Sequence, residues 1–185
     1  MNGTATIGDA VAEHLAHLGM PRDSGASARW VTVRFLGVPV AFPNFDARRA
    51  VLFTHDVHHL LTGYATTWTG EAEIGAFELR TGCGTLWAAW MFNSGGWLFG
   101  LFIAPRRLFA AFVRARSCTN FYRTPRDRVA ALTVAAGRNA LGLDRPAPPV
   151  SARDVLAFVL WSFGIVGFWV GLPLATLAVL ITLAS

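Results

Sequence analysis

The alternation of apolar and polar positions along the chain predicts a fold built mainly from helices. A short amphipathic helix should start near Asp9. The segment "ARRAVLFTHDVHHLLTGY" then repeats apolar residues at helical spacing, with Asp46 placed to cap its start and Gly63 placed to end it. A second helix should begin at about Thr69 or Gly70 and continue through "EAEIGAFELR". We therefore expect an all-α protein.

The segments between and after these helices predict further elements. Arg29–Phe45 is rich in β-branched and aromatic residues and is broken by Gly37 and by prolines, which fits either a small hairpin or an extended segment. A basic amphipathic run after Arg106 fits a solvated helix or a helix lying in a membrane interface. One further helix is expected over 125–141.

Two long stretches of the chain carry no charged side chain. The first lies between Arg80 and Arg106, is interrupted by glycines, and fits either a buried or lipid-lined helix or a true membrane span. The second runs from Val155 to Ser185. A single helix of that length would measure about 46 Å, against a hydrocarbon core of about 30 Å. The sequence leaves open one long kinked helix or a hairpin of two short arms.

This distribution of charge predicts the domain organisation. Residues 1–144 should form a helical membrane-associated domain, 145–153 a linker, and 154–185 a transmembrane helix or hairpin. Arg145 and Arg153 precede the apolar segment. By the positive-inside rule they keep the main domain on the cytoplasmic side of the inner (cytoplasmic) membrane.

Composition supports a membrane location and excludes several chemistries. Hydrophobic residues make up 54% of the chain, charged residues 15%, and the formal net charge is +5. Every basic residue is arginine, which excludes a Schiff-base lysine and the lysine of a phosphate-binding P-loop. The arginines lie among Trp, Phe and Leu, so membrane lipid is expected as a partner and nucleic acid is not. Cys83 and Cys118 match no zinc-ligand spacing and should be free thiols.

Three of the five histidines fall in the short segment "THDVHHLLTGY". On a helix, His55 and His59 stand one turn apart with Asp56 beside them, whereas His58 lies on the opposite flank. Glu71 can join them only if the glycines that follow allow a turn into an antiparallel helix. Two histidines, an aspartate and a glutamate suit zinc, iron or manganese. The spacing alone fits equally well a surface pair or a satisfied core pair of histidines.

The same window resembles a known family. "HDVHH" followed by Glu71 is similar to the HDxxH…E signature of the coenzyme Q (ubiquinone) biosynthesis protein 4 family, and "HLLTGY" and "GEAEIGAF" resemble segments of its bacterial members. The resemblance covers about Arg48–Leu79, and Val155–Ser185 is not part of the family's pattern. It implies an all-α fold at a membrane. It also implies a divalent metal, zinc foremost and iron or manganese otherwise, between two antiparallel helices at His55, Asp56, His59 and Glu71.

The resemblance also implies a function. The family is associated with removing the carboxyl group at C1 of a prenylated quinone precursor and hydroxylating that carbon. The chain would then be a metal-dependent lyase (decarboxylase) or an oxidative decarboxylase. In this interpretation Trp87, Trp90 and Trp97 help line the isoprenoid path, and other quinone-biosynthesis enzymes or a second copy of the chain are candidate partners. The competing hypothesis is a non-catalytic lipid-binding scaffold that organises other membrane enzymes.

Overall fold

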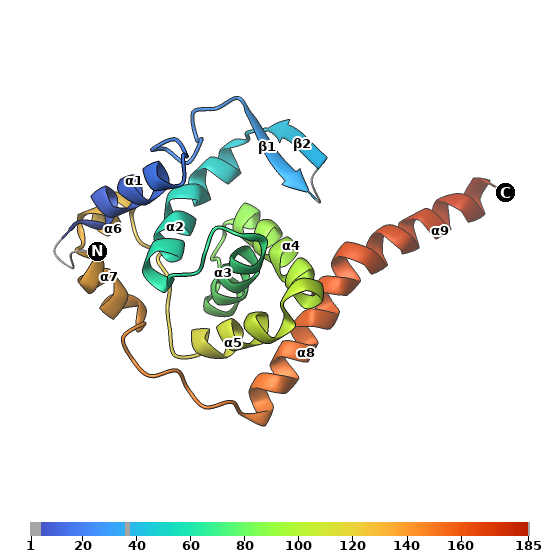
Figure 1. Cartoon of the computed structure of the whole chain (residues 1–185). Helices are drawn as coiled ribbons and strands as arrows, with labels where there is room; N and C mark the ends of the chain where they lie inside the picture. Colours follow the sequence, from blue (N-terminus) through green and yellow to red (C-terminus); the bar gives the residue numbers. More distant parts are fainter. Residues whose placement is uncertain (1–4, 36–37, 185) are drawn as a thin grey trace. The chain divides into compact units, whose positions relative to one another are not determined.

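The computed structural model describes residues 5–35 and 38–184 and is mostly helical, with one two-stranded sheet (Figure 1). The expectation of a helical fold is confirmed. The chain forms two compact units that interleave along the sequence. The first unit comprises the residues up to Tyr64, Gly82–Trp90 and Cys118–Pro146, and the second unit comprises Ala65–Thr81, Met91–Ser117 and the residues from Ala147 onward.

The first unit is built around two helices that bury their apolar faces. Its elements are α1 (Ile7–His17), β1 (Trp30–Phe35), β2 (Val38–Pro43), α2 (Asp46–Thr62), α6 (Arg126–Ala131) and α7 (Val134–Leu141). Apolar residues at helical spacing on α1 and α2 share one core with residues of α6 and α7, including Ile7, Val11, Leu15, Val57, Leu61, Val129 and Leu141. α2 ends where Gly63 takes a left-handed conformation (φ 77°), as the sequence predicts. This core fixes the helix that carries the three clustered histidines.

The segment before α2 is a hairpin rather than an isolated extended segment. β1 and β2 pair antiparallel, from Trp30 opposite Pro43 to Phe35 opposite Val38. Gly37, where the sequence predicts a break, lies outside the described residues.

Two of the predicted helix boundaries are wrong. Asp46 is the first residue of α2 and not its cap. The single helix expected over 125–141 is divided into α6 and α7. Leu132 is extended at the break, where its carbonyl oxygen accepts a hydrogen bond from the Ile7 N–H (2.8 Å), and the Thr133 hydroxyl caps α7. A contact from the distant start of α1 thus interrupts the helix, and a local pattern cannot reveal it.

The second unit gathers α3 (Trp68–Thr81), most of α4 (Trp87–Ile103), α5 (Pro105–Ala115), α8 (Ala152–Val166), the π-helix η1 (Gly167–Gly171) and α9 (Leu172–Ala184). α3 and α4 approach closely at Gly75, where a Cβ atom would lie 2.8 Å from the carbonyl oxygen of Asn93. Buried carboxylates on α3 are paired: Glu73 accepts two hydrogen bonds from Arg107 (2.9 and 2.7 Å), and Glu78 accepts one from the Asn93 amide (2.5 Å).

An aromatic cluster holds α8 against α4 and α5. Trp97 of α4 has no exposed surface and donates its indole N–H to the Ser162 hydroxyl of α8 (3.2 Å). Its ring centroid lies 5.3 Å from that of Phe112, 5.0 Å from Phe158 and 6.1 Å from Trp161. The first half of the C-terminal apolar helix is therefore part of the packed second unit.

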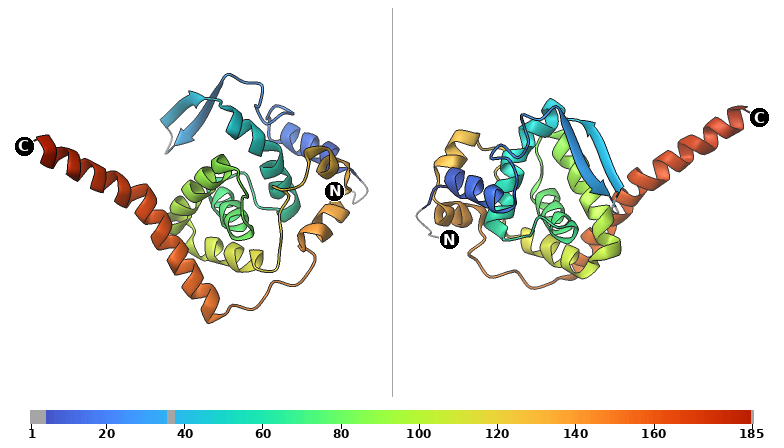
Figure 2. Two further views of the ribbon diagram at one scale, coloured as in Figure 1. Left: turned by 180° about the vertical axis from the view of Figure 1, so that it is seen from behind. Right: turned by 45° about the horizontal axis from the view of Figure 1, so that its top comes forward.

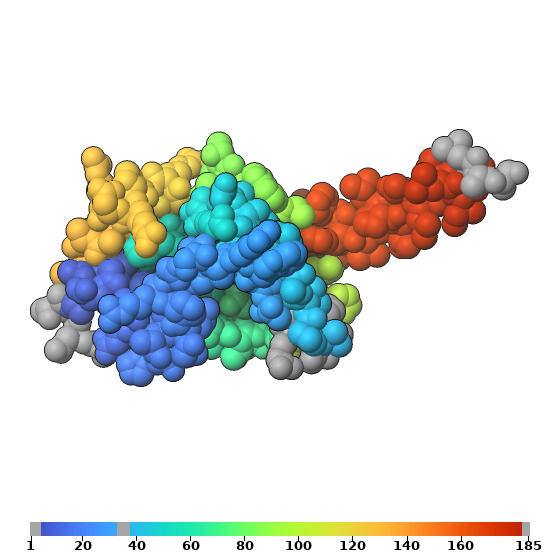
Figure 3. All heavy atoms as spheres, turned by 90° about the horizontal axis from the view of Figure 1, so that it is seen from above, coloured from blue at the N-terminus to red at the C-terminus, as the bar shows by residue number. Residues whose placement is uncertain are grey.

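One helix among the described residues is long and apolar enough to cross a membrane, judged by length and composition. It spans Ala152–Thr182, has a hydropathy of 2.2, and runs as one continuous rod through α8, η1 and α9 (Figure 2). The hairpin alternative is therefore wrong. Only 6% of its apolar window is buried, and α9 stands clear of the other elements of its unit (Figure 3). The π-helical turn lies just before Pro173, which has no N–H to continue the α-helical pattern.

Candidate metal centre

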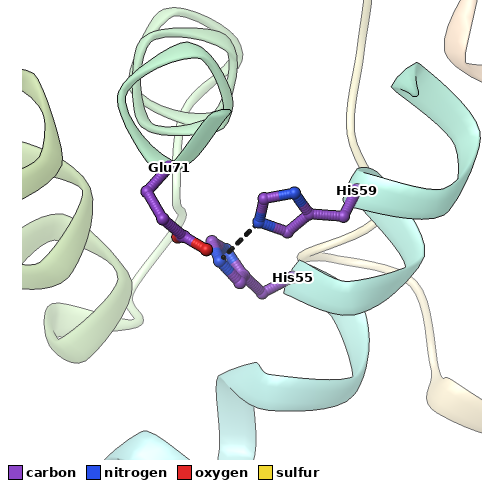
Figure 4. Close-up of side chains that lie close together, drawn as sticks. All are labelled: His55, His59 and Glu71. Atoms are coloured by element: carbon purple, nitrogen blue, oxygen red, sulfur yellow. Dashed lines mark hydrogen bonds between the residues drawn. The ribbon is translucent and has the colours of Figure 1, made fainter. Parts of the chain in front are cut away.

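Two histidines of α2 present their ring nitrogens to each other. His55 and His59 are one helical turn apart, and their Nε2 atoms lie 3.2 Å from each other (Figure 4). The ring centroids are 4.7 Å apart, and the rings are nearly perpendicular, at 82°. The two Nε2 atoms are close enough to share one proton or one metal ion.

The backbone fixes which nitrogen of His59 carries a proton. Gly63 turns the chain at the end of α2 so that the Tyr64 carbonyl oxygen lies 2.9 Å from Nδ1 of His59. A carbonyl oxygen can only accept, so Nδ1 donates, and the Nε2 atom of the neutral ring directs its lone pair toward His55. Metal-binding histidines are oriented by a hydrogen bond of this kind. The imidazole of His59 is 2% exposed, which limits competition from water.

Glu71 of α3 completes a group of three residues whose side chains could hold a metal ion. One carboxylate oxygen of Glu71 and one nitrogen from each of His55 and His59 all lie within 4.8 Å of one another (Figure 4). Five residues separate Thr62, the last of α2, from Trp68, the first of α3. Glu71 therefore follows the two histidines closely in sequence.

The donor set fits a divalent transition metal. Two nitrogens bound to one tetrahedral ion at about 2.0–2.1 Å lie about 3.3 Å from each other, close to the separation of the two Nε2 atoms. Two histidines and one carboxylate are a common protein ligand set for catalytic zinc and for non-haem iron. Both arrangements leave coordination positions open for a substrate or water. The donor atoms alone do not choose between the metals.

Asp56 does not belong to this group. Its Oδ2 accepts a hydrogen bond from the Ser24 hydroxyl. Burial lowers the pKa of the neighbouring Arg48 guanidinium, and the Asp56 carboxylate acts in the opposite direction. The structure thus joins Asp56 to a loop serine and an arginine, while the role as a fourth metal ligand stays a prediction.

The sequence predicts a loop over 21–28 but does not single out Ser24 within it. Ser24 is buried and has a left-handed backbone conformation (φ 58°), which is rare outside glycine and asparagine. The Asn44 amide donates to the carbonyl oxygens of Gly25 and Ala28 (2.9 and 2.8 Å), and the Asp23 carboxylate accepts the Gly25 N–H (3.0 Å). Hydrogen bonds from the Ser27 side chain and N–H lower the pKa of Asp23. The signal that could have singled out Ser24 is its place in a dense run of Asp, Ser and Gly.

His58 has a structural role, in agreement with its expected position on the other flank of α2. It is completely buried, and its Nε2 accepts a hydrogen bond from the Phe121 N–H (3.1 Å). Its ring stacks on that of Phe121 and meets Tyr122 edge to face. A nitrogen that accepts from the backbone is occupied, so His58 anchors the segment 118–122 to α2.

The three tryptophans proposed to line an isoprenoid path lie in different surroundings. Trp97 is completely buried in the aromatic cluster with α8. Trp87 is 56% exposed and stacks on Phe45, and Trp90 donates its indole N–H to the Gly84 carbonyl oxygen (3.0 Å). The structure gives each a packing or hydrogen-bonding partner, and their role toward a lipid stays a prediction.

Comparisons with protein-family models, with curated proteins and with solved structures found no match. The resemblance over Arg48–Leu79 therefore stays a prediction, and the candidate metal centre rests on the positions of His55, His59 and Glu71.

Proposed function

We propose that the chain is a membrane-anchored metalloprotein that acts on the head group of a prenylated aromatic acid. His55, His59 and Glu71 hold a divalent metal, and the apolar helix Ala152–Thr182 spans the membrane with the main domain on the cytoplasmic side. The observation that carries the proposal is the His55–His59 pair, with Nε2 atoms 3.2 Å apart and one ring oriented by a backbone carbonyl.

The membrane part of the proposal is supported by the exposed apolar helix. A long helix with 6% of its apolar window buried would be costly to leave in water. Arg145 lies before this helix and Arg153 lies in its first turn, which supports the cytoplasmic orientation.

The substrate class rests on the resemblance of the histidine window to the coenzyme Q biosynthesis protein 4 family. A divalent metal at this centre would bind the carboxylate of such an acid and stabilise the negative charge that develops as carbon dioxide departs. The chain's own residues then have defined tasks. His59 keeps its ring orientation through Tyr64, and Asp56, held by Ser24, contributes negative charge beside the metal ligands.

The metal centre is tested by elemental mass spectrometry on the intact chain purified in detergent. We expect about one metal per chain, with most of it lost in His59→Ala and in Glu71→Ala. His17→Ala and Glu13→Ala are matched controls, because both side chains are exposed on α1. The proposal is abandoned if carefully handled wild type holds no metal, or if His59→Ala binds metal as well as wild type does.

The substrate is tested separately with the metal-loaded chain in lipid vesicles. Prenylated 4-hydroxybenzoic acid is supplied with and without oxygen, and products are identified by mass. Loss of carbon dioxide that depends on His59 supports the lyase activity, and oxygen in the product supports an oxidative decarboxylase. If the metal-loaded chain leaves the acid unchanged, the proposal of a metal centre stands and the proposed substrate class is refuted.

The second candidate function is a non-catalytic lipid-binding scaffold, favoured by the exposed apolar helix. In that case Ala substitutions of the metal ligands leave the cellular function intact, whereas truncation at Arg153 destroys it. A complementation assay in a strain lacking the chain distinguishes the two candidate functions. The metalloprotein requires both the metal ligands and the apolar helix, whereas the scaffold requires the helix alone.

A further inference from the structure

A charged pocket lies at the start of the apolar C-terminal helix. Its volume is about 510 Å³, and it is lined by Arg80, Arg116, Ser151, Ala152, Arg153 and Asp154. All of these residues belong to the second unit. Three arginines surround a single carboxylate, so the pocket carries an excess of two positive charges.

The carboxylate in the pocket is engaged by its immediate neighbours. Asp154 is 1% exposed, and its Oδ2 accepts hydrogen bonds from Arg116 (2.5 Å) and from the N–H and hydroxyl of Ser151 (2.9 and 2.6 Å). Arg116 donates in addition to the Pro149 carbonyl oxygen (3.0 Å). Asp154 therefore caps α8, fixes Arg116, and neutralises one of the three arginines.

The other two arginines keep donors for a ligand. Nη2 of Arg80 forms an ion pair with Asp154 Oδ1 at 3.6 Å, beyond hydrogen-bond distance, and its guanidinium lies 4.3 Å from the centre of the Phe112 ring. Arg153 is exposed on the first turn of α8. Neither side chain makes a hydrogen bond to any part of the chain that the structure describes. Guanidinium groups bind phosphate with paired, charge-assisted hydrogen bonds, so two of them beside one pocket suit a phosphate group.

The surface next to the pocket is apolar. Directly after Arg153, exposed residues follow on α8 at helical spacing, with exposures from 40% to 75%: Val155, Leu156, Val159, Leu160 and Phe163. A soluble phosphate ester has nothing to place on such a surface, whereas a lipid has acyl chains. Basic pockets at the cytoplasmic end of membrane helices bind anionic head groups by this combination.

We propose that the pocket formed by Arg80, Arg116 and Arg153 binds the phosphate group of an anionic lipid whose acyl chains lie along α8. The site is separate from the metal ligands and does not depend on the function proposed for them. Bound lipid would add hydrogen bonds between α3, α5 and α8 and so strengthen the attachment of the membrane helix to its unit.

The test measures thermal unfolding of the intact chain in an uncharged detergent. The probes are dioctanoyl phosphatidic acid, dioctanoyl phosphatidylcholine and inorganic phosphate. The variants are Arg153→Gln and the double variant R80Q/R153Q, and R128Q/R145Q is the control because it removes the same charge from two exposed positions. Arg153→Gln keeps the test informative if the double variant fails to fold, since the exposed Arg153 side chain has no hydrogen bond or ion pair to lose within residues 5–35 and 38–184.

We expect phosphatidic acid to raise the unfolding temperature saturably, phosphatidylcholine to do so far less, and the control variant to respond as wild type does. Arg153→Gln should weaken the apparent affinity roughly tenfold, and the double variant more, because each arginine contributes charge-assisted hydrogen bonds. An equal response to inorganic phosphate at matched concentration would overturn the assignment to a lipid. An undiminished response in Arg153→Gln, or an equal loss in the control, would overturn the site itself.

Discussion

Neighbouring histidines on α2 should respond to substitution in opposite ways. His58→Leu should destabilise the fold and leave metal binding intact, whereas His59→Leu should abolish metal binding and destabilise the metal-free chain less than His58→Leu does. The two side chains are adjacent in sequence and both buried. The difference comes from what their ring nitrogens contact. Nε2 of His58 accepts from the backbone N–H of the buried Phe121, whereas Nε2 of His59 faces His55. The hydrogen bond that His59 also makes, from Nδ1 to a carbonyl oxygen, ends on the half-buried Tyr64.

The size of the His58 effect follows from its contacts. Leucine has a similar volume but no acceptor, so the Phe121 N–H would lose its partner in a residue that is 6% exposed. An unsatisfied buried donor costs about 1–3 kcal/mol. For a chain of this size each kcal/mol lowers the unfolding temperature by about 2–4 °C, so we expect a decrease of about 2–12 °C. His58→Gln can retain an acceptor near the Nε2 position and should recover part of this loss.

The assay combines thermal unfolding after chelation with elemental analysis before it. Chelation is needed because a metal that binds only the folded chain adds stability of its own and would mask the comparison. The reasoning is refuted if His58→Leu loses the metal, or if it unfolds at the wild-type temperature. It is equally refuted if His59→Leu retains the metal.

Three further substitutions test the packing described above. Trp97→Ala should cost about 3–5 kcal/mol of unfolding free energy, whereas Trp30→Ala, at a position 56% exposed, should cost far less. Similar losses in the two variants would contradict a stabilising role for the aromatic cluster. Gly75→Ala should cost about 1–3 kcal/mol of unfolding free energy, because the added Cβ meets the backbone of α4. Gly164→Ala, where a Cβ has nothing within 4 Å, should be neutral or stabilising by up to about 1 kcal/mol in the same thermal unfolding experiment. Ser24→Gly should be more stable than Ser24→Ala by about 1 kcal/mol, because both lose the hydroxyl but only glycine accepts φ 58° without strain. Equal stabilities of the two variants in chemical unfolding would argue against backbone strain at this residue.

Features that depend on local pattern could be predicted from the sequence. The spacing of apolar residues in α2 and the glycine that ends it predicted the helix, and the i, i+4 relation predicted that His55 and His59 meet. The charge-free C-terminal segment predicted a helix that could cross a membrane. In each case the residues that determine the structure lie within a few turns of one another.

Features that depend on contacts between distant segments could not be predicted. Leu132 breaks a helix because of a hydrogen bond from Ile7, and Asp56 is engaged by Ser24, which lies far away in sequence. Trp97 packs against rings of α5 and α8, partners that its own segment does not indicate. Side-chain partners of this kind are set by the tertiary fold, and no periodicity along the chain encodes them.

The packing of α8 has a consequence for how the chain would search for a ligand dissolved in the bilayer. α9 alone is 13 residues, or about 20 Å, which is too short for a hydrocarbon core of about 30 Å. The missing length must come from η1 and the end of α8, which Trp97 and its neighbours clamp to α4 and α5. The second unit would then be set directly into the lipid surface and could not swing on a flexible tether. Such a protein diffuses laterally in two dimensions at a fixed depth, and its encounters with hydrophobic ligands depend on their density per membrane area rather than on their concentration in water.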